Sequence, residues 1–232
     1  MKYLTPVFPF LAGWILLLLS HTLSTIALVN GVAQLLLFFF VVHLPIKNTG
    51  RMSYVDIGWP LGVALIGLVT VLLSHGYWPR VAMIGGVYLL VGLRMGLGAL
   101  HMWRLGKLQV EFPRYEYQKL RWHREGKTNV SFAMQVEASV QGLANASYLA
   151  FPALIIGSNP TSVVSAFEVI GLAPGLWIDT VATVIGMAFL VRTRLVPEEV
   201  KVLFLFVVVA STAYAVQNNL GALHQLGLSP LG

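Results

Sequence analysis

The sequence contains no cysteine and few charged residues. Without cysteine the chain can form no disulfide, no thiolate metal site and no haem attachment motif. Charged residues make up 10% of the chain and hydrophobic residues 57%, whereas a soluble domain carries about 25% charged residues. Too few polar side chains remain to cover a globular protein of 232 residues. The composition therefore excludes an ordinary soluble enzyme and predicts an all-α, multi-pass membrane protein.

Long apolar runs recur along the chain and predict a bundle of seven transmembrane helices. A span needs about 20 apolar residues, and the first run, from Leu4 to Ile46, is too long for a single helix. We divide it at the more polar stretch 20–25. The predicted spans are residues 5–21, 24–45, 54–74, 79–103, 131–156, 165–191 and 199–220. Since the sequence shows no internal repeat or linker, we expect a single integral-membrane domain over residues 1–232.

Basic residues are distributed unevenly between the two sides that these spans define. Of the 15 Lys and Arg residues, all except Arg80 and Arg94 fall at the N-terminus or in the second, fourth and sixth connections. Cytoplasmic loops carry an excess of Lys and Arg, so we expect a cytoplasmic N-terminus. The same bias explains the net charge of +6, and no nucleic-acid partner is expected. Joining the first two spans leaves a six-span alternative.

The longest predicted connection, residues 104–130, carries about half of the charge of the chain. Most connections are short, so we expect this one to form an ordered cytoplasmic cap over the bundle. Arg114 is expected to pair with Glu111 or with an acidic residue at a helix end. A lipid headgroup, a nucleotide phosphate or an acidic partner surface would suit its mixture of cations and aromatic rings. The candidate anion-binding or cofactor-side residues are Arg104, Arg114, Tyr115, Tyr117 and Arg121.

Polar residues inside the predicted spans mark a second set of candidates. An ionisable group in the bilayer core costs about 2.5–3.5 kcal/mol on insertion scales, so its presence indicates a function. Glu137, Gln141 and Asn145 are spaced by four residues and therefore share one helix face, which must point into the bundle. A substrate or lipid pocket is one interpretation of this face. Hydrogen bonds between helices, without any ligand, are the other.

Two other spans contribute residues to the same candidate pocket. Arg94 lies inside the fourth span and needs an anion, for which Glu137 and Asp56 are the best candidates. Asp56 and Trp59 lie at the start of the third span. Their alternative roles are structural: an ion pair for Arg94, a helix N-cap for Asp56 and an interfacial position for Trp59.

Four motifs resemble those of a known family. They are SYVDIGW at 53–59, GLR at 92–94, EFPRYEYQKLRW at 111–122 and MQVEASVQGLAN at 134–145. Over about residues 50–176 the chain resembles an uncharacterised bacterial membrane family grouped with the steroid 5-alpha-reductases. This resemblance implies a location in a bacterial inner membrane. This resemblance implies a seven-span reductase fold that uses NADPH to reduce an activated C=C bond in a steroid- or isoprenoid-like lipid.

The resemblance ends near Leu176, and two functions remain open. Relatives continue with a His-Pro-Asn-Tyr motif that helps to hold NADPH, and this sequence contains no such motif. The first hypothesis is a non-catalytic membrane subunit or lipid-binding protein, without a cofactor, whose partners are membrane lipids and other integral-membrane subunits. The second is a working NADPH-dependent reductase with a rearranged cofactor site. Since the spacing of metal-ligating residue types is also absent from the sequence, no metal is expected.

Overall fold

The computed structural model describes residues 3–162 and residue 164 of the chain, and within this part every regular element is helical. The helices are α1 (Phe8–Leu19), α2 (Ser24–Phe38), α3 (Leu44–Thr49), α4 (Val55–Leu73), α5 (Trp78–Arg104), α6 (Pro113–Arg124), α7 (Val130–Ala146) and α8 (Ala150–Ser158). A π-helical turn, η2 (Phe39–His43), joins α2 to α3, and the 3-10 turns η1 (Thr5–Val7), η3 (Met52–Tyr54) and η4 (Lys107–Gln109) precede α1, α4 and α6.

Four helical segments in this part of the chain are long and apolar enough to cross a membrane. They are Ser24–Thr49, Met52–Leu73, Trp78–Arg104 and Val130–Ser158, and Thr5–Leu19 is a shorter apolar helix. The division at residues 20–25 is confirmed, because α1 ends at Leu19 and α2 begins at Ser24. The prediction of an all-α, membrane-type bundle is therefore confirmed for the described residues. The predicted spans 165–191 and 199–220 lie outside them.

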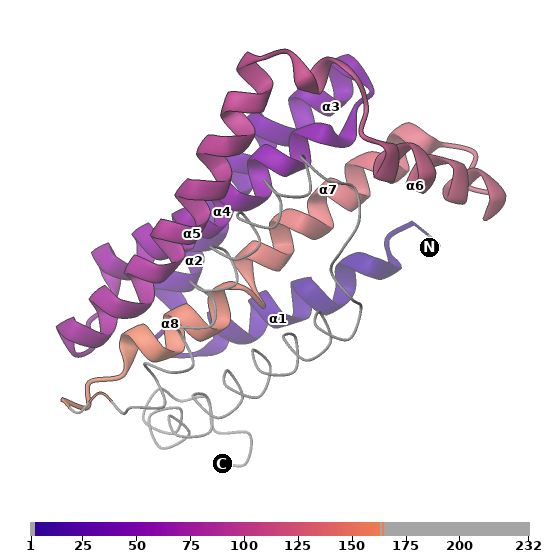
Figure 1. Ribbon diagram of the computed structural model, residues 1–232. Coiled ribbons are helices and arrows are strands. Elements are labelled where there is room, and N and C mark those ends of the chain that lie inside the picture. Colours follow the sequence, from indigo (N-terminus) through magenta and orange to yellow (C-terminus); the bar gives the residue numbers. More distant parts are fainter. Residues whose placement is uncertain (1–2, 163, 165–232) are drawn as a thin grey trace, which may run out of the picture.

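Helix α4 lies at the centre of the bundle. It packs against α2, α5, α7 and α8, while α1 packs against α2 and α7. Figure 1 shows α2, α4 and α5 running side by side, with α8 at one end of the bundle and α6 at the other. The α4–α5 contact is close because Gly92 has no side chain: a β-carbon there would lie 2.2 Å from the backbone nitrogen of Ala64. Small residues allow two helix backbones to approach in this way.

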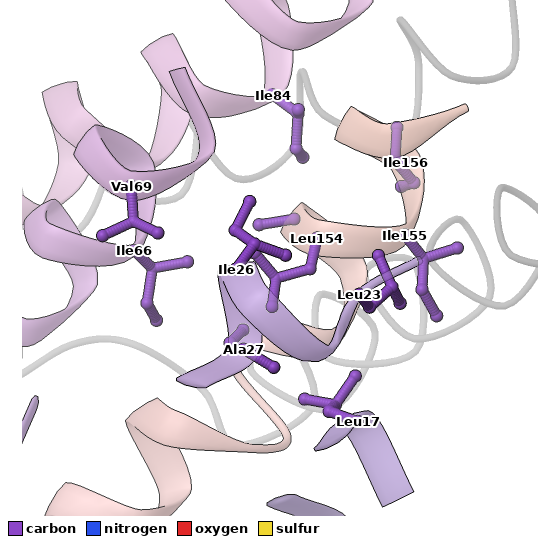
Figure 2. Packing of buried hydrophobic residues seen from close by; sticks show 12 residues of the cluster. Leu17, Leu23, Ile26, Ala27, Ile66, Val69, Ile84, Leu154, Ile155 and Ile156 are labelled. Atoms are coloured by element: carbon purple, nitrogen blue, oxygen red, sulfur yellow. The ribbon is translucent and has the colours of Figure 1, made fainter. Parts of the chain in front are cut away.

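Two clusters of buried apolar side chains hold the bundle together. At the α8 end, α1, α2, α4, α5 and α8 contribute residues such as Leu17, Ile66 and Leu154, which point toward one another (Figure 2). At the α6 end, Phe38 and Trp122 belong to a second cluster with residues of η2, α3, η3, α4 and α7. Trp122 is only 2% exposed and is the buried residue of α6, so this side chain anchors α6 to the end of the bundle.

The expected fifth span, residues 131–156, corresponds to the candidate span Val130–Ser158, which contains a short interruption between two helices. Helix α7 ends at Ala146, and α8 begins at Ala150. The hydroxyl of Ser147 donates a hydrogen bond to the carbonyl of Leu143 at 2.6 Å. Back-bonding of a serine to the preceding turn bends helices, and here it accompanies a break. The expected loop at 104–130 likewise contains regular structure, the helix α6.

Candidate functional site

Glu111 fixes the segment before α6 to the start of α4. Its carboxylate accepts hydrogen bonds from the backbone N–H groups of Met52 at 2.7 Å and Ser53 at 3.0 Å, and from the Ser53 hydroxyl at 2.6 Å. Lys119 of α6 forms an ion pair with it at 2.7 Å. The Ser53 hydroxyl accepts a hydrogen bond from the N–H of Phe112. Glu111 thus satisfies N–H groups at the start of a helix, which have no partner within that helix.

These contacts lower the pKa of the Glu111 carboxyl below its ordinary value of 4.5. Burial alone would raise this pKa, but the hydrogen bonds from Lys119, Ser53 and Met52 outweigh burial. The side chain is only 7% exposed. Glu111 is therefore a buried, ionised structural acceptor at neutral pH.

Beside Glu111 an open cleft of about 520 Å³ lies between α4, α5, α6 and α7. The predicted site residues that line it are Asp56, Trp59, Arg114, Tyr115, Glu137 and Gln141. Arg114 forms an ion pair with Asp56, and the Tyr115 hydroxyl donates to the same carboxylate oxygen at 2.8 Å. The Arg114 guanidinium also lies over the Tyr115 ring, 4.7 Å from its centroid. The sequence predicted that Arg114 would pair with Glu111 or with an acidic residue at a helix end. The structure shows the second kind of partner, Asp56 in the first turn of α4.

The Tyr115 hydroxyl is a hydrogen-bond donor in this cleft. Burial, together with the neighbouring Asp56 carboxylate, raises the pKa of the Tyr115 phenol well above its ordinary value. The phenol therefore stays protonated at neutral pH and donates to Asp56. With Arg114 and Tyr115 both directed at one carboxylate, the charges at this side of the cleft compensate each other.

The polar face of α7 divides between this cleft and the interior of the bundle. The Nε2 of Gln141 donates to the Oε1 of Glu137 at 3.1 Å, and both side chains are half-buried. Asn145, one turn further, is fully buried, and its Nδ2 donates to the carbonyl of Trp59 at 3.1 Å. The spacing therefore predicts correctly that these three side chains share an inward face. Their functional role stays a prediction.

Asn145 also belongs to a cluster of buried amides that the sequence interpretation missed. Gln34 donates through Nε2 to the carbonyl of Gly62 at 2.8 Å and to Asn30 Oδ1 at 3.3 Å, and Asn30 donates to the backbone carbonyl of Asn145 at 3.4 Å. Gly62 makes room for them, because a β-carbon there would lie 2.1 Å from the Asn145 Nδ2. Asn30 and Gln34 are four residues apart in an apolar run, so the spacing rule that identified the α7 face would have found them.

The remaining predicted residues lie away from the cleft. Tyr117 is 63% exposed, and Arg104 lies exposed at the end of α5. Arg121 forms an exposed ion pair with Glu125 at 3.2 Å. Arg94 is half-buried on α5, outside the residues that line the cleft.

A larger groove of about 890 Å³ runs between α2 and α7. Its wall is mostly apolar and includes Trp14 of α1, Leu35 and Phe38 of α2, and Leu143 of α7, while Lys47 lies at the α6 end of the bundle. None of these residues was a predicted site residue. The groove depends on the way that helices distant in sequence pack together, which the hydropathy pattern does not contain.

A polar pair interrupts the apolar wall of this groove. The Nδ1 of His43 lies 2.5 Å from the Oε1 of Gln135, whose Nε2 donates to the backbone carbonyl of His43 at 3.3 Å. His43 is the last residue of the π-helical turn η2, and π-helical turns inside helices are frequent at functional sites. Among residues 3–162, no group of three or more His, Asp and Glu side chains is placed to hold a metal ion.

The described part of the chain is thus a helical membrane-type bundle with one polar cleft and one apolar groove. Residues 15–191 match a family described as "Protein of unknown function (DUF1295)". Since this match covers more than half of the chain, the protein belongs to that family. The match extends beyond residues 50–176, on which the sequence resemblance rests. No curated protein and no solved structure was found to match the chain.

Proposed function

We propose that this protein is an integral-membrane lipid-binding protein, and that the groove between α2 and α7 receives the tail of a membrane lipid. The observation that carries this proposal is the apolar groove of about 890 Å³, formed by helices long and apolar enough to span a bilayer. Trp14, Phe38 and Leu143 offer a wall for dispersion contacts with an alkyl chain. The bilayer itself supplies such chains.

We also propose seven spans with the N-terminus and α6 on the cytoplasmic side of a bacterial inner membrane. The support is the charge asymmetry of the described residues, since cytoplasmic segments carry an excess of Lys and Arg. The connections at the α6 end contain Lys47, Arg51, Arg104, Lys107, Arg114, Lys119, Arg121, Arg124 and Lys127. At the opposite end, the connections 20–23 and 74–77 contain no Lys or Arg, and the first turn of α5 contains one, Arg80.

The state of the polar cleft supports a non-catalytic role. Two carboxylates, Asp56 and Glu137, line the cleft together with one cation, Arg114, which is already paired with Asp56. The described residues therefore do not fit the phosphates of a dinucleotide such as NADPH, and we propose that the protein works without a cofactor. Its partners on this proposal are membrane lipids and other integral-membrane subunits.

The second candidate is an NADPH-dependent reductase of a C=C bond in a steroid- or isoprenoid-like lipid. The resemblance to the steroid 5-alpha-reductases suggests it, and one observation favours it: Arg114 and Tyr115 line an open cleft at the basic end of the bundle. NADPH fluorescence titrated against the full-length protein in detergent tests this candidate. Saturable binding that Arg114→Gln abolishes and Arg124→Gln retains would establish it, whereas absence of binding supports the non-catalytic role.

Native mass spectrometry of the purified protein tests lipid binding in the groove. Leu35 and Leu36 are neighbours on α2 and are 62% and 53% exposed, but only Leu35 lines the groove. Leu35→Trp adds volume to the groove, and Leu36→Trp adds the same volume outside it. We expect near-stoichiometric lipid on the unmodified protein and on Leu36→Trp, and a clear loss on Leu35→Trp. Equal lipid content in the two variants would contradict the proposed site.

A further inference from the structure

We infer that the groove between α2 and α7 selects lipids that carry a hydroxyl group, and that the Nε2 of His43 accepts the hydrogen bond from this hydroxyl. The inference rests on the proposed function, since it specifies the class of lipid that the groove takes. It follows from the geometry of His43 and Gln135, which lie 92 positions apart in the sequence and meet in the groove wall.

Gln135 determines which nitrogen of the His43 ring carries the proton. The backbone carbonyl of His43 can only accept a hydrogen bond, so the Gln135 amide must turn its NH₂ group toward this carbonyl. The amide oxygen then faces the His43 Nδ1 at 2.5 Å. Because this oxygen can only accept, Nδ1 must be the donor. A neutral imidazole protonated on Nδ1 has a lone pair on Nε2, and Nε2 is therefore an acceptor.

This acceptor is available to a ligand. The His43 ring is half-buried and lines the groove. Within the part of the chain that the structure describes, its side-chain hydrogen bond is the one to Gln135, made through Nδ1. Nε2 lies on the opposite edge of the ring, so that bond leaves it unused.

The position of His43 along the groove suits the polar head of a single-chain lipid. Lys47 and Asn129 line the groove at the α6 end of the bundle, one helical turn beyond His43, whereas Phe38 and Trp14 line it toward the interior. A lipid with its tail along the Phe38 and Trp14 wall places its head beside His43. An alcohol can donate to Nε2, but an ether or ester has no proton to donate, and an ionised carboxylate or phosphate presents only lone pairs.

Quenching of Trp14 fluorescence by brominated lipids tests this selectivity, because Trp14 lines the same groove. The two probes are a long-chain alcohol brominated at mid-chain and its methyl ether, in which a methyl group replaces the hydroxyl hydrogen and removes the hydrogen-bond donor. The Trp14→Phe variant supplies the background from the other five tryptophans. A single net hydrogen bond corresponds to about a fivefold difference in affinity, so we expect the alcohol to half-quench Trp14 at a concentration about fivefold lower than the ether.

His43→Phe keeps an aromatic ring in the groove wall and removes Nε2. We expect this variant to bind the ether as before and to bind the alcohol no better than the ether. If His43→Phe does not fold, Gln135→Leu takes its place. That variant keeps the His43 ring but removes the amide oxygen that holds the proton on Nδ1. The ratio of the affinities for the alcohol and for the ether should then fall toward one.

Two other outcomes would overturn the inference, and they can be told apart. Equal preference for the alcohol in the unmodified protein and in His43→Phe, or no preference at all, rejects the role of His43 and leaves lipid binding in the groove intact. Quenching by neither probe beyond the Trp14→Phe background rejects the proposed function and the inference together.

Discussion

Replacing Glu111 by alanine removes the side chain that joins the segment before α6 to the start of α4. The carboxylate accepts three hydrogen bonds, from the backbone N–H groups of Met52 and Ser53 and from the Ser53 hydroxyl. It also forms an ion pair with Lys119. In Glu111→Ala the two N–H groups at the start of the helix lose their acceptor, and Lys119 loses its partner.

The expected loss of unfolding free energy is about 2–3 kcal/mol. Removing a helix-capping acceptor costs about 1 kcal/mol and at most about 2, and the Glu111 side chain caps two N–H groups while being 7% exposed. The ion pair adds less than about 1 kcal/mol, because the Lys119 side chain is 24% exposed and solvent screens the interaction. Glu111→Gln retains one carbonyl oxygen as an acceptor and should fall between the alanine variant and the unmodified protein.

Unfolding by SDS in mixed micelles, followed by far-ultraviolet circular dichroism, measures this loss. Glu125→Ala is the matched control, because the Glu125 side chain is 44% exposed in its ion pairs with Arg121 and Lys127, and the substitution should cost less than about 0.5 kcal/mol. If Glu111→Ala is destabilised no more than Glu125→Ala, the segment before α6 is not held by Glu111, and the proposed role of this carboxylate is refuted.

Three further predictions concern other contacts and the topology. A β-carbon at position 92 would lie 2.2 Å from the Ala64 nitrogen, whereas one at position 86 of the same helix would have nothing within 4 Å. Gly92→Ala should therefore lower the unfolding free energy by about 2 kcal/mol and Gly86→Ala should not lower it, and equal effects would contradict the α4–α5 contact. The pKa of Glu111 is lower in the folded protein than its ordinary value of 4.5. The stabilisation by the ionised Glu111 carboxylate should therefore be fully present above about pH 4.5 and disappear as the pH falls through the lowered folded pKa. A stability difference between the unmodified protein and Glu111→Gln that is constant down to pH 3 would contradict this direction. In the naturally cysteine-free chain, Lys107→Cys and Glu116→Cys should react with an impermeant maleimide only from the cytoplasmic side and His75→Cys only from the other side, and the reverse pattern would overturn the proposed topology.

The sequence was sufficient to predict the long apolar helices among the described residues, because bilayer thickness fixes how long and how apolar a span must be. The same applies to the inward face of α7, since a four-residue spacing places Glu137 and Gln141 together on any helix. Both features are local, and each can be read within a single segment. The break at Ser147 was not predicted, although Pro152 in the first turn of α8 is a sequence signal for it, because a proline has no N–H group to bond to the preceding turn.

The long-range pairings could not be predicted in this way. Glu111 is three residues from Arg114 and was a natural partner for it, but the fold brings the start of α4 beside both side chains. Arg114 then pairs with Asp56, and Glu111 accepts from Met52 and Ser53. Neither the groove nor its polar pair was predicted from sequence, since both depend on the packing of α2 against α7.

An electron cryo-microscopy map of the full-length protein in lipid nanodiscs tests lipid binding most directly. We expect an elongated density along the groove between α2 and α7, with its tail against Phe38 and Leu143 and its head beside His43. A groove that is closed by protein side chains, or filled by another segment of the chain, would contradict the proposal that this protein binds a membrane lipid there.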